Sequence, residues 1–179
     1  IGGGANIKLI LKYYLQFLYY RWSGCIPLIK DPIAVLSAEW IYQRFGASVI
    51  VMIRHPAAFV GSLKKQGWAY PFDHLLSQTD LLTDHLEPFY NQIVEYAQTP
   101  PDIIDQAILL WTIIYSVVKK YHCRYNDWIF LRHEDISREP IDQFHKLYTA
   151  LDLEFTDSIK ETIREHTKAQ NRTEYDKNN

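Results

Sequence analysis

The run from Ser48 to Ile53 (SVIVMI) constrains the fold more than any other segment of the chain. It is continuously apolar after its first residue and rich in β-branched side chains. That composition is typical of a parallel strand buried on both faces. Arg54, His55 and Pro56 end the run, and helical spacing then continues to about Gly67. The sequence therefore predicts a strand, a sharp turn and a helix, with a cation at the carboxyl end of the strand.

Two other segments are predicted to be strands, Ile26 to Lys30 and Asp127 to Arg132. Apolar residues at helical spacing predict helices at 6–21, 33–45, 56–67, 103–121, 141–151 and 156–168. A loop is expected from His133 to Pro140. Strands that alternate with helices favour an α/β fold with a central parallel sheet and right-handed crossovers. The length suits one domain over residues 1–179.

One local pattern occurs twice. Lys30-Asp31-Pro32 and Arg54-His55-Pro56 each place a cation at a strand end, and one residue separates it from a proline that opens a helix. Ligands of open α/β sheets bind at the carboxyl ends of the strands, and helix N-termini favour anions. The repeated pattern therefore indicates a ligand rich in phosphate.

The overall charge restricts the kind of partner. A net charge of −2 argues against a nucleic-acid-binding protein, so an anion must be held by a few placed cations. The two cysteines, Cys25 and Cys123, are too few for a disulfide framework and are expected to be free thiols in a reducing, cytoplasmic compartment. No metal-ligand spacing is present, and no apolar run reaches the length of a transmembrane helix.

Arg54 and Ser62 are the strongest candidates for binding such an anion. A guanidinium offers phosphate a planar fork of donors, and a serine hydroxyl adds one more hydrogen bond. Between them, Ala57, Ala58 and Gly61 form a stripe of small residues that lets a ligand approach the helix. The alternative is that Arg54 is a solvated charge and that the small stripe packs the helix against the sheet.

The segment from Arg54 to Lys64 resembles the 3'-phosphate-binding segment of sulfotransferases that use 3'-phosphoadenosine 5'-phosphosulfate (PAPS). In that family the arginine of Arg-x-Pro and a serine eight residues later hold the 3'-phosphate, which implies this role for Arg54 and Ser62. Leu28 to Pro32 resembles the lysine-containing strand end that precedes this motif, and Leu131 to Pro140 is similar to a later strand and loop. The resemblance is closest to bacterial carbohydrate and small-molecule sulfotransferases.

The resemblance implies a P-loop-NTPase-like three-layer fold, with a central parallel sheet flanked by helices. It implies transfer of a sulfuryl group from PAPS to a hydroxyl or amine of a carbohydrate, lipid or small molecule. Adenosine 3',5'-bisphosphate would be the product, and no metal would be needed. The glycine-rich loop that grips the 5'-phosphosulfate in this family is absent. We therefore expect the N-terminal strand and loop to be missing, and the chain alone to be inactive.

Two of the remaining site residues, Asp31 and Lys30, have two interpretations each. Asp31 is either the base that accepts the acceptor's proton or the cap of the helix at Pro32. Lys30 either faces the donor's sulfate or pairs with Asp31. His133 stands where the resemblance places a tyrosine near the adenine. His55 is expected to cap its helix, and Glu134 is expected to accept backbone N–H groups.

Two other functions remain open at this point. One is nucleotide-dependent phosphoryl transfer, which would need a Walker loop, and none is present. The other is a sulfotransferase-like module that binds carbohydrate or a partner without turnover. The aromatic cluster of Trp68, Tyr70 and Phe72 is a candidate lining for the acceptor pocket.

Overall fold

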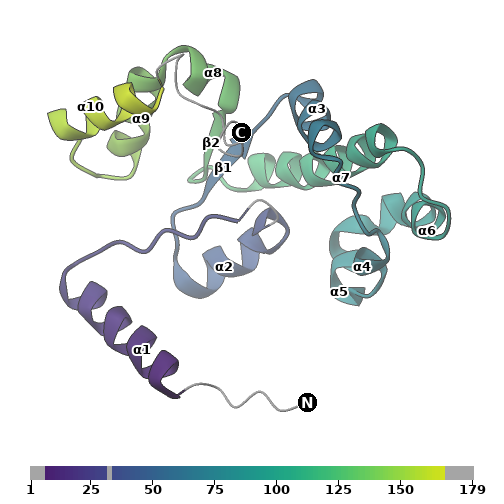
Figure 1. Ribbon diagram of the computed structural model, residues 1–179, viewed down its shortest axis with the longest axis horizontal. Helices are drawn as coiled ribbons and strands as arrows, with labels where there is room; N and C mark the ends of the chain where they lie inside the picture. Colours follow the sequence, from purple (N-terminus) through teal and green to yellow (C-terminus); the bar gives the residue numbers. More distant parts are fainter. Residues whose placement is uncertain (1–6, 32–33, 168–179) are drawn as a thin grey trace. The chain divides into compact units, whose positions relative to one another are not determined.

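The computed structural model describes residues 7–31 and 34–167. The chain divides into two compact units, Ile1–Pro32 and Ile33–Asn179. In the first unit, helix α1 (Ile7–Trp22) is followed by an irregular segment that reaches Asp31. All other described elements belong to the second unit (Figure 1).

The expected three-layer α/β fold is wrong, because the described residues are mostly helical and contain one small sheet. This sheet consists of β1 (Ile50–Ile53) and β2 (Ile129–Arg132). The two strands are parallel, with Ile50 opposite Ile129 and Ile53 opposite Arg132. The prediction of these two strands and of their parallel direction is confirmed.

The third expected strand, Ile26 to Lys30, has no strand structure. Its apolar side chains are exposed, with Ile26 at 71% and Leu28 at 83%. Apolar and β-branched side chains fit a half-buried pleated sheet. Such a run forms a strand only when its backbone pairs with the edge of another strand. No such pairing is present among the described residues.

Helix α7 (Ile103–Arg124) organises the second unit. It begins at Asp102, whose Oδ1 accepts hydrogen bonds from the N–H groups of Ile104 (2.8 Å) and Asp105 (3.0 Å). Both core clusters of the unit include residues of this helix. The first cluster contains Ala38, Val51, Val117, Val118, Tyr121 and Trp128. The second contains Phe72, Leu75, Leu86, Ile93, Leu109 and Ile113.

Two elements pack directly against α7. Helix α3 (Pro56–Gln66) lies against it, and the 3-10 turn η1 (Ala34–Ser37) contacts it and leads into α2 (Ala38–Phe45). Short helices fill most of the stretch between α3 and α7: α4 (Asp73–Leu76), α5 (Thr79–Leu81), η2 (Leu82–Leu86), η3 (Glu87–Phe89) and α6 (Tyr90–Gln98).

Three helices follow β2: α8 (His133–Arg138), α9 (Pro140–Ala150) and α10 (Asp157–His166). The expected loop from His133 to Pro140 is therefore wrong. Asp135 lies three residues before Arg138 and pairs with it at 3.8 Å, which supports a helical turn.

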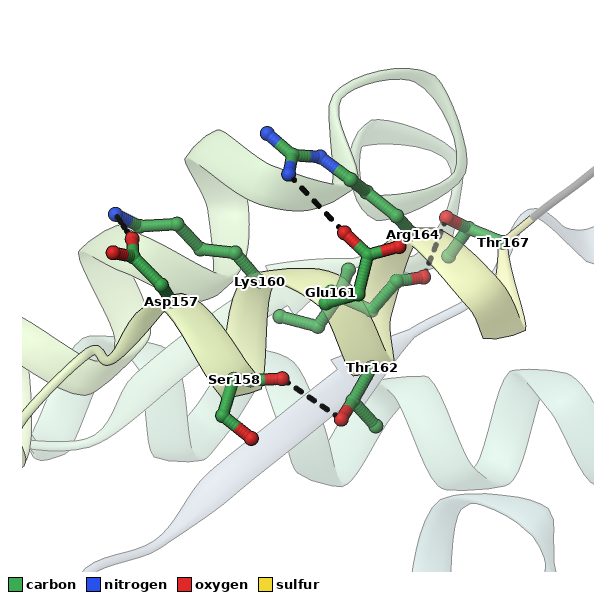
Figure 2. Close-up of polar contacts among 8 residues, drawn as sticks. Asp157, Ser158, Lys160, Glu161, Thr162, Arg164 and Thr167 are labelled. Atoms are coloured by element: carbon green, nitrogen blue, oxygen red, sulfur yellow. Dashed lines mark hydrogen bonds and ion pairs between the residues drawn. The ribbon is translucent and has the colours of Figure 1, made fainter.

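Ion pairs of the same spacing cover the surface of α10, as Figure 2 shows. Lys160 lies 2.7 Å from Asp157, and Arg164 lies 3.4 Å from Glu161. The Thr156 hydroxyl caps the helix by accepting from the Ile159 N–H. Exposed pairs of this kind each stabilise a helix only slightly, so the apolar contacts of α10 with α9 matter more for its position.

Candidate functional site

The turn between β1 and α3 is held at Arg54 by two side chains of α7. The Arg54 N–H donates to the Tyr115 hydroxyl (2.6 Å), and the Trp111 indole N–H donates to the Arg54 carbonyl (3.1 Å). Trp111 and Tyr115 lie four residues apart on the helix, and their rings stack with centroids 4.4 Å apart. Both backbone groups of Arg54 are therefore satisfied by one helix, which fixes where its side chain starts.

His55 satisfies the first turn of α3. Its Nδ1 accepts from the Ala57 N–H (3.2 Å), and its carbonyl accepts from the N–H groups of Ala58 and Phe59 (3.0 Å each). The predicted cap is confirmed. Because these amides are occupied and Pro56 has none, the helix offers a ligand its dipole rather than free N–H groups.

Glu134 ties this turn to the start of α8. Its Oε1 accepts from the His55 N–H at 2.8 Å, which confirms that Glu134 acts as an acceptor for backbone amides. This hydrogen bond is the main cause that lowers the pKa of Glu134, so the side chain is a carboxylate at neutral pH. The carboxyl ends of β1 and β2 are thus joined by a charge-assisted bond.

The Arg54 side chain is half-buried, and its Nε is buried without a hydrogen-bond partner among the described residues. No ion pair of Arg54 is present in that part of the chain either. An arginine is always charged, and a buried donor without an acceptor costs free energy. A bound anion would supply the missing acceptor and the missing counter-charge.

The stripe of small residues on α3 is open. Ala57, Ala58 and Gly61 are exposed, and a Cβ added at Gly61 would meet no atom within 4 Å. The interpretation that this stripe packs the helix against the sheet is therefore wrong. Ser62 is half-buried, and its hydroxyl makes no hydrogen bond to another described residue. Arg54 and Ser62 thus both leave side-chain donors unused within the same strand–helix unit.

Burial raises the pKa of Tyr115 above its ordinary value of 10.0, and this effect exceeds the opposing effect of the Arg54 N–H. Tyr115 is therefore a neutral phenol at neutral pH. It can accept from the Arg54 amide and still has a hydroxyl proton to donate.

His133 is the first residue of α8, exposed, with its Nδ1 3.5 Å from the Ser137 hydroxyl oxygen. It directly follows the last β1–β2 pair on one strand, as Arg54 does on the other. The two residues therefore leave the sheet at the same edge. The adenine-side role of His133 stays a prediction.

Lys30 and Asp31 belong to the first unit, whereas Arg54, Ser62 and His133 belong to the second. Both are exposed and lie in irregular structure. The helix that Asp31 was expected to cap at Pro32 falls partly outside the described residues, which resume at the 3-10 turn beginning at Ala34. Their catalytic roles stay predictions.

The sequence predicted the helix that carries Trp111 and Tyr115, but their role was missed. The available signal was that both rings carry a polar tip, and a buried tryptophan or tyrosine usually finds a hydrogen-bond partner. The aromatic cluster also differs from expectation, since Phe72 is buried in the core and cannot line a pocket. Trp68 remains exposed, at 63%.

A scan against protein-family models found no match, and neither a comparison with curated proteins nor one with solved structures found a protein similar to this chain.

Proposed function

We propose that this chain is part of a PAPS-dependent sulfotransferase and that Arg54 and Ser62 bind the 3'-phosphate of the nucleotide. The observation that carries the proposal is the Arg54 guanidinium at the carboxyl end of β1. Its Nε is buried and without a partner among the described residues, beside the N-terminus of α3. The order of the motifs along the chain supports the same nucleotide.

A phosphate dianion suits the charges at this turn. The Arg54 guanidinium offers a fork of N–H donors, and the α3 dipole adds partial positive charge at the same end of the helix. Trp111, Tyr115 and Glu134 hold the surrounding backbone from two other helices. Because protein groups alone supply this support, binding would require little further ordering of the turn, and the entropy cost of binding would be small.

The reaction transfers SO3 from an oxygen of PAPS to an oxygen or nitrogen of the acceptor. The bond from sulfur to the bridging oxygen of PAPS breaks, a new bond forms from sulfur to the acceptor hydroxyl or amine, and adenosine 3',5'-bisphosphate leaves. The acceptor's proton passes to a base, for which Asp31 is the candidate. Lys30 would neutralise charge on the sulfuryl group in transfer and on the departing 5'-phosphate, and His133 would contact the adenine. Like phosphoryl transfer, this chemistry depends mainly on positioning and on charge stabilisation.

Calorimetry with adenosine 3',5'-bisphosphate tests the anchor. Arg54→Ala should weaken binding by about 2–4 kcal/mol, the range for removing a charged partner from a desolvated anion. Adenosine 5'-monophosphate, which lacks the 3'-phosphate, should bind wild type and variant equally. Arg138→Ala removes another arginine of the second unit and should change neither ligand. An effect of Arg54→Ala below roughly 0.5 kcal/mol would reject the assignment.

Turnover distinguishes the three functions that the sequence left open. Transfer of labelled sulfate from PAPS to carbohydrate, lipid or phenolic acceptors supports a sulfotransferase. Transfer of phosphate from ATP supports a phosphotransferase. Binding of adenosine 3',5'-bisphosphate without turnover, in the protein that includes any sequence encoded upstream of Ile1, supports a binding module.

A further inference from the structure

Helix α1 carries exposed apolar surface from Leu9 to Trp22. Over this stretch its large aliphatic and aromatic side chains are exposed by between 46%, at Leu9, and 88%, at Trp22, except for the half-buried Leu18. Exposed apolar surface of this extent marks a site of interaction with another molecule or with a membrane. The charges and the kinds of side chain on the helix decide between these.

The charge of this part of the chain is positive, although the whole chain has a net charge of −2. All 21 acidic residues stand at or after Asp31. Four basic residues precede it, Lys8, Lys12, Arg21 and Lys30. A surface that complements α1 therefore combines an apolar layer, for its aliphatic and aromatic side chains, with negative charge, for its basic residues.

The aromatic residues of α1 favour a lipid headgroup region. Tyrosine and tryptophan combine an apolar ring with a polar tip, and both are enriched where membranes meet water. The helix contains Tyr13, Tyr14, Tyr19, Tyr20 and Trp22. Lysine and arginine can bury their stems and keep their charges at the headgroups.

The distribution of apolar residues around α1 argues against a protein groove. A groove takes one stripe of a helix, with anchors three and four residues apart. In α1 the consecutive residues Leu9, Ile10 and Leu11 are all exposed and, at 100° per residue, point in different directions. Lys12 and Gln16, four residues apart, mark the narrow polar side. A wide apolar arc beside a narrow polar face that includes Lys12 suits the boundary of a bilayer.

We propose that α1 binds the surface of membranes rich in anionic phospholipid, lying in the interface with Lys12 and Gln16 toward water. Helix α1 has 16 residues and is about 24 Å long. A transmembrane helix needs roughly 20 residues. In the described part of the chain, no helix is long and apolar enough to cross a membrane. This proposal does not depend on the sulfotransferase activity.

Flotation of the 179-residue chain with lipid vesicles tests the proposal. Binding to vesicles that contain phosphatidylglycerol should exceed binding to pure phosphatidylcholine by at least about tenfold, and should fall at high salt, because each basic residue near an anionic surface adds binding free energy. Equal binding to the two lipids, or none to either, overturns the proposal.

Charge reversal on α1 is the matched test. The triple variant Lys8→Glu, Lys12→Glu and Arg21→Glu should lose at least about tenfold in binding to the anionic vesicles. The control Lys119→Glu, Lys120→Glu and Lys146→Glu changes the net charge equally on exposed residues of the second unit and should bind as wild type does. Equal losses in both triple variants would show a general charge effect and overturn the proposal.

Circular dichroism of both triple variants checks that their helices persist. Sedimentation velocity covers the competing occupant, a second copy of the chain. A wild type that dimerises through α1, loses this dimer on Phe17→Ser with Trp22→Ser, and ignores vesicles would also overturn the membrane proposal. If α1 does not survive charge reversal, the lipid and salt comparison on the wild type decides alone.

Discussion

At the scale of single residues, the candidate site depends on how backbone groups beyond β1 are satisfied. Arg54 has both of its backbone groups bonded to α7 side chains, and His55 has its N–H bonded to Glu134. The Arg54 Nε has no partner in the described chain. The protein thus satisfies the backbone of this turn and leaves the charged side chain available. Folded proteins seldom bury an unpartnered charged donor except where function requires it.

The Glu134–His55 bond gives a pH-dependent prediction. The His55 N–H lowers the pKa of Glu134 below its ordinary value of 4.5. The carboxylate therefore contributes stability that is fully present above that pH and is lost as pH falls through the lowered pKa. Glu134→Gln keeps an acceptor but removes the charge. Urea unfolding should show wild type to be more stable than Glu134→Gln at pH 7, and the difference should be smaller at pH 3, below the ordinary pKa of the carboxyl.

The exposed Glu139 provides the control for this comparison. Glu139→Gln lies five residues further along the chain and should leave the difference between pH 7 and pH 3 unchanged. If Glu134→Gln is less stable than wild type by the same margin at both pH values, the carboxylate charge is not what the His55 amide stabilises.

At the scale of elements, α3 shows how local signals set the limits of a helix. His55 and Pro56 open it, and Gly67 ends it in the left-handed conformation, with φ of +65°. The Gly67 N–H bonds the carbonyls of Leu63 and Lys64, which is a common way for a helix to end. In its interior, Gly61 sits in open space and serves no steric need of the folded chain.

Two alanine substitutions in this helix should have opposite effects. Gly61→Ala should stabilise the protein by about 0.5–1 kcal/mol, because alanine is the better helix former and no atom obstructs its methyl group. Gly67→Ala should destabilise it by about 1–2 kcal/mol, because a Cβ is strained at positive φ even where space is free. Thermal unfolding measures both, and the same sign for the two variants would contradict the assigned helix end.

A gain in stability with a loss of adenosine 3',5'-bisphosphate affinity in Gly61→Ala would add support for the proposed site. Such a result would mean that the nucleotide lies close to the stripe of small residues on α3, where an added methyl group obstructs it. Unchanged affinity would place the nucleotide away from Gly61 while leaving the Arg54 assignment to its own test.

At the scale of the second unit, α7 joins two core clusters that lie along one helix. Its first half contributes Leu109 and Ile113 to one cluster, and its second half contributes Val117, Val118 and Tyr121 to the other. Because one continuous helix contributes to both clusters, loss of packing in one cluster should also destabilise the other. We expect the unit to unfold in a single cooperative transition.

Ile113→Ala and Trp128→Ala test this coupling, one in each cluster. Ile113 is 1% and Trp128 5% exposed, so the variants should lose about 2–5 and about 3–5 kcal/mol of unfolding free energy. Ile108→Ala, on the same helix but 49% exposed, should cost far less. Fluorescence and far-ultraviolet circular dichroism should report coincident urea transitions in all three. Separate transitions in either core variant would show that the clusters unfold independently.

Local sequence signals were sufficient for several parts of this protein. The runs that became β1 and β2 are short and apolar, the first of them rich in β-branched residues, and the limits of α3 follow from His55, Pro56 and Gly67. Each signal acts within a few residues, through the covalent geometry of proline and glycine, capping and side-chain shape. For the same reason, Arg54 was identified as a strand-end cation from the sequence alone.

Only the tertiary structure decided which segments and side chains meet. Ile26 to Lys30 has the composition of a strand but finds no partner edge among the described residues, and Ile108 belongs to an apolar helix face yet stays exposed. The contacts of Arg54 with Trp111 and Tyr115 cross 57 and 61 residues of chain. Local periodicity carries no information about such distant partners, because their contacts form only when the separate helices pack. The sequence therefore determined the pieces of the candidate site, and packing decided how they are held.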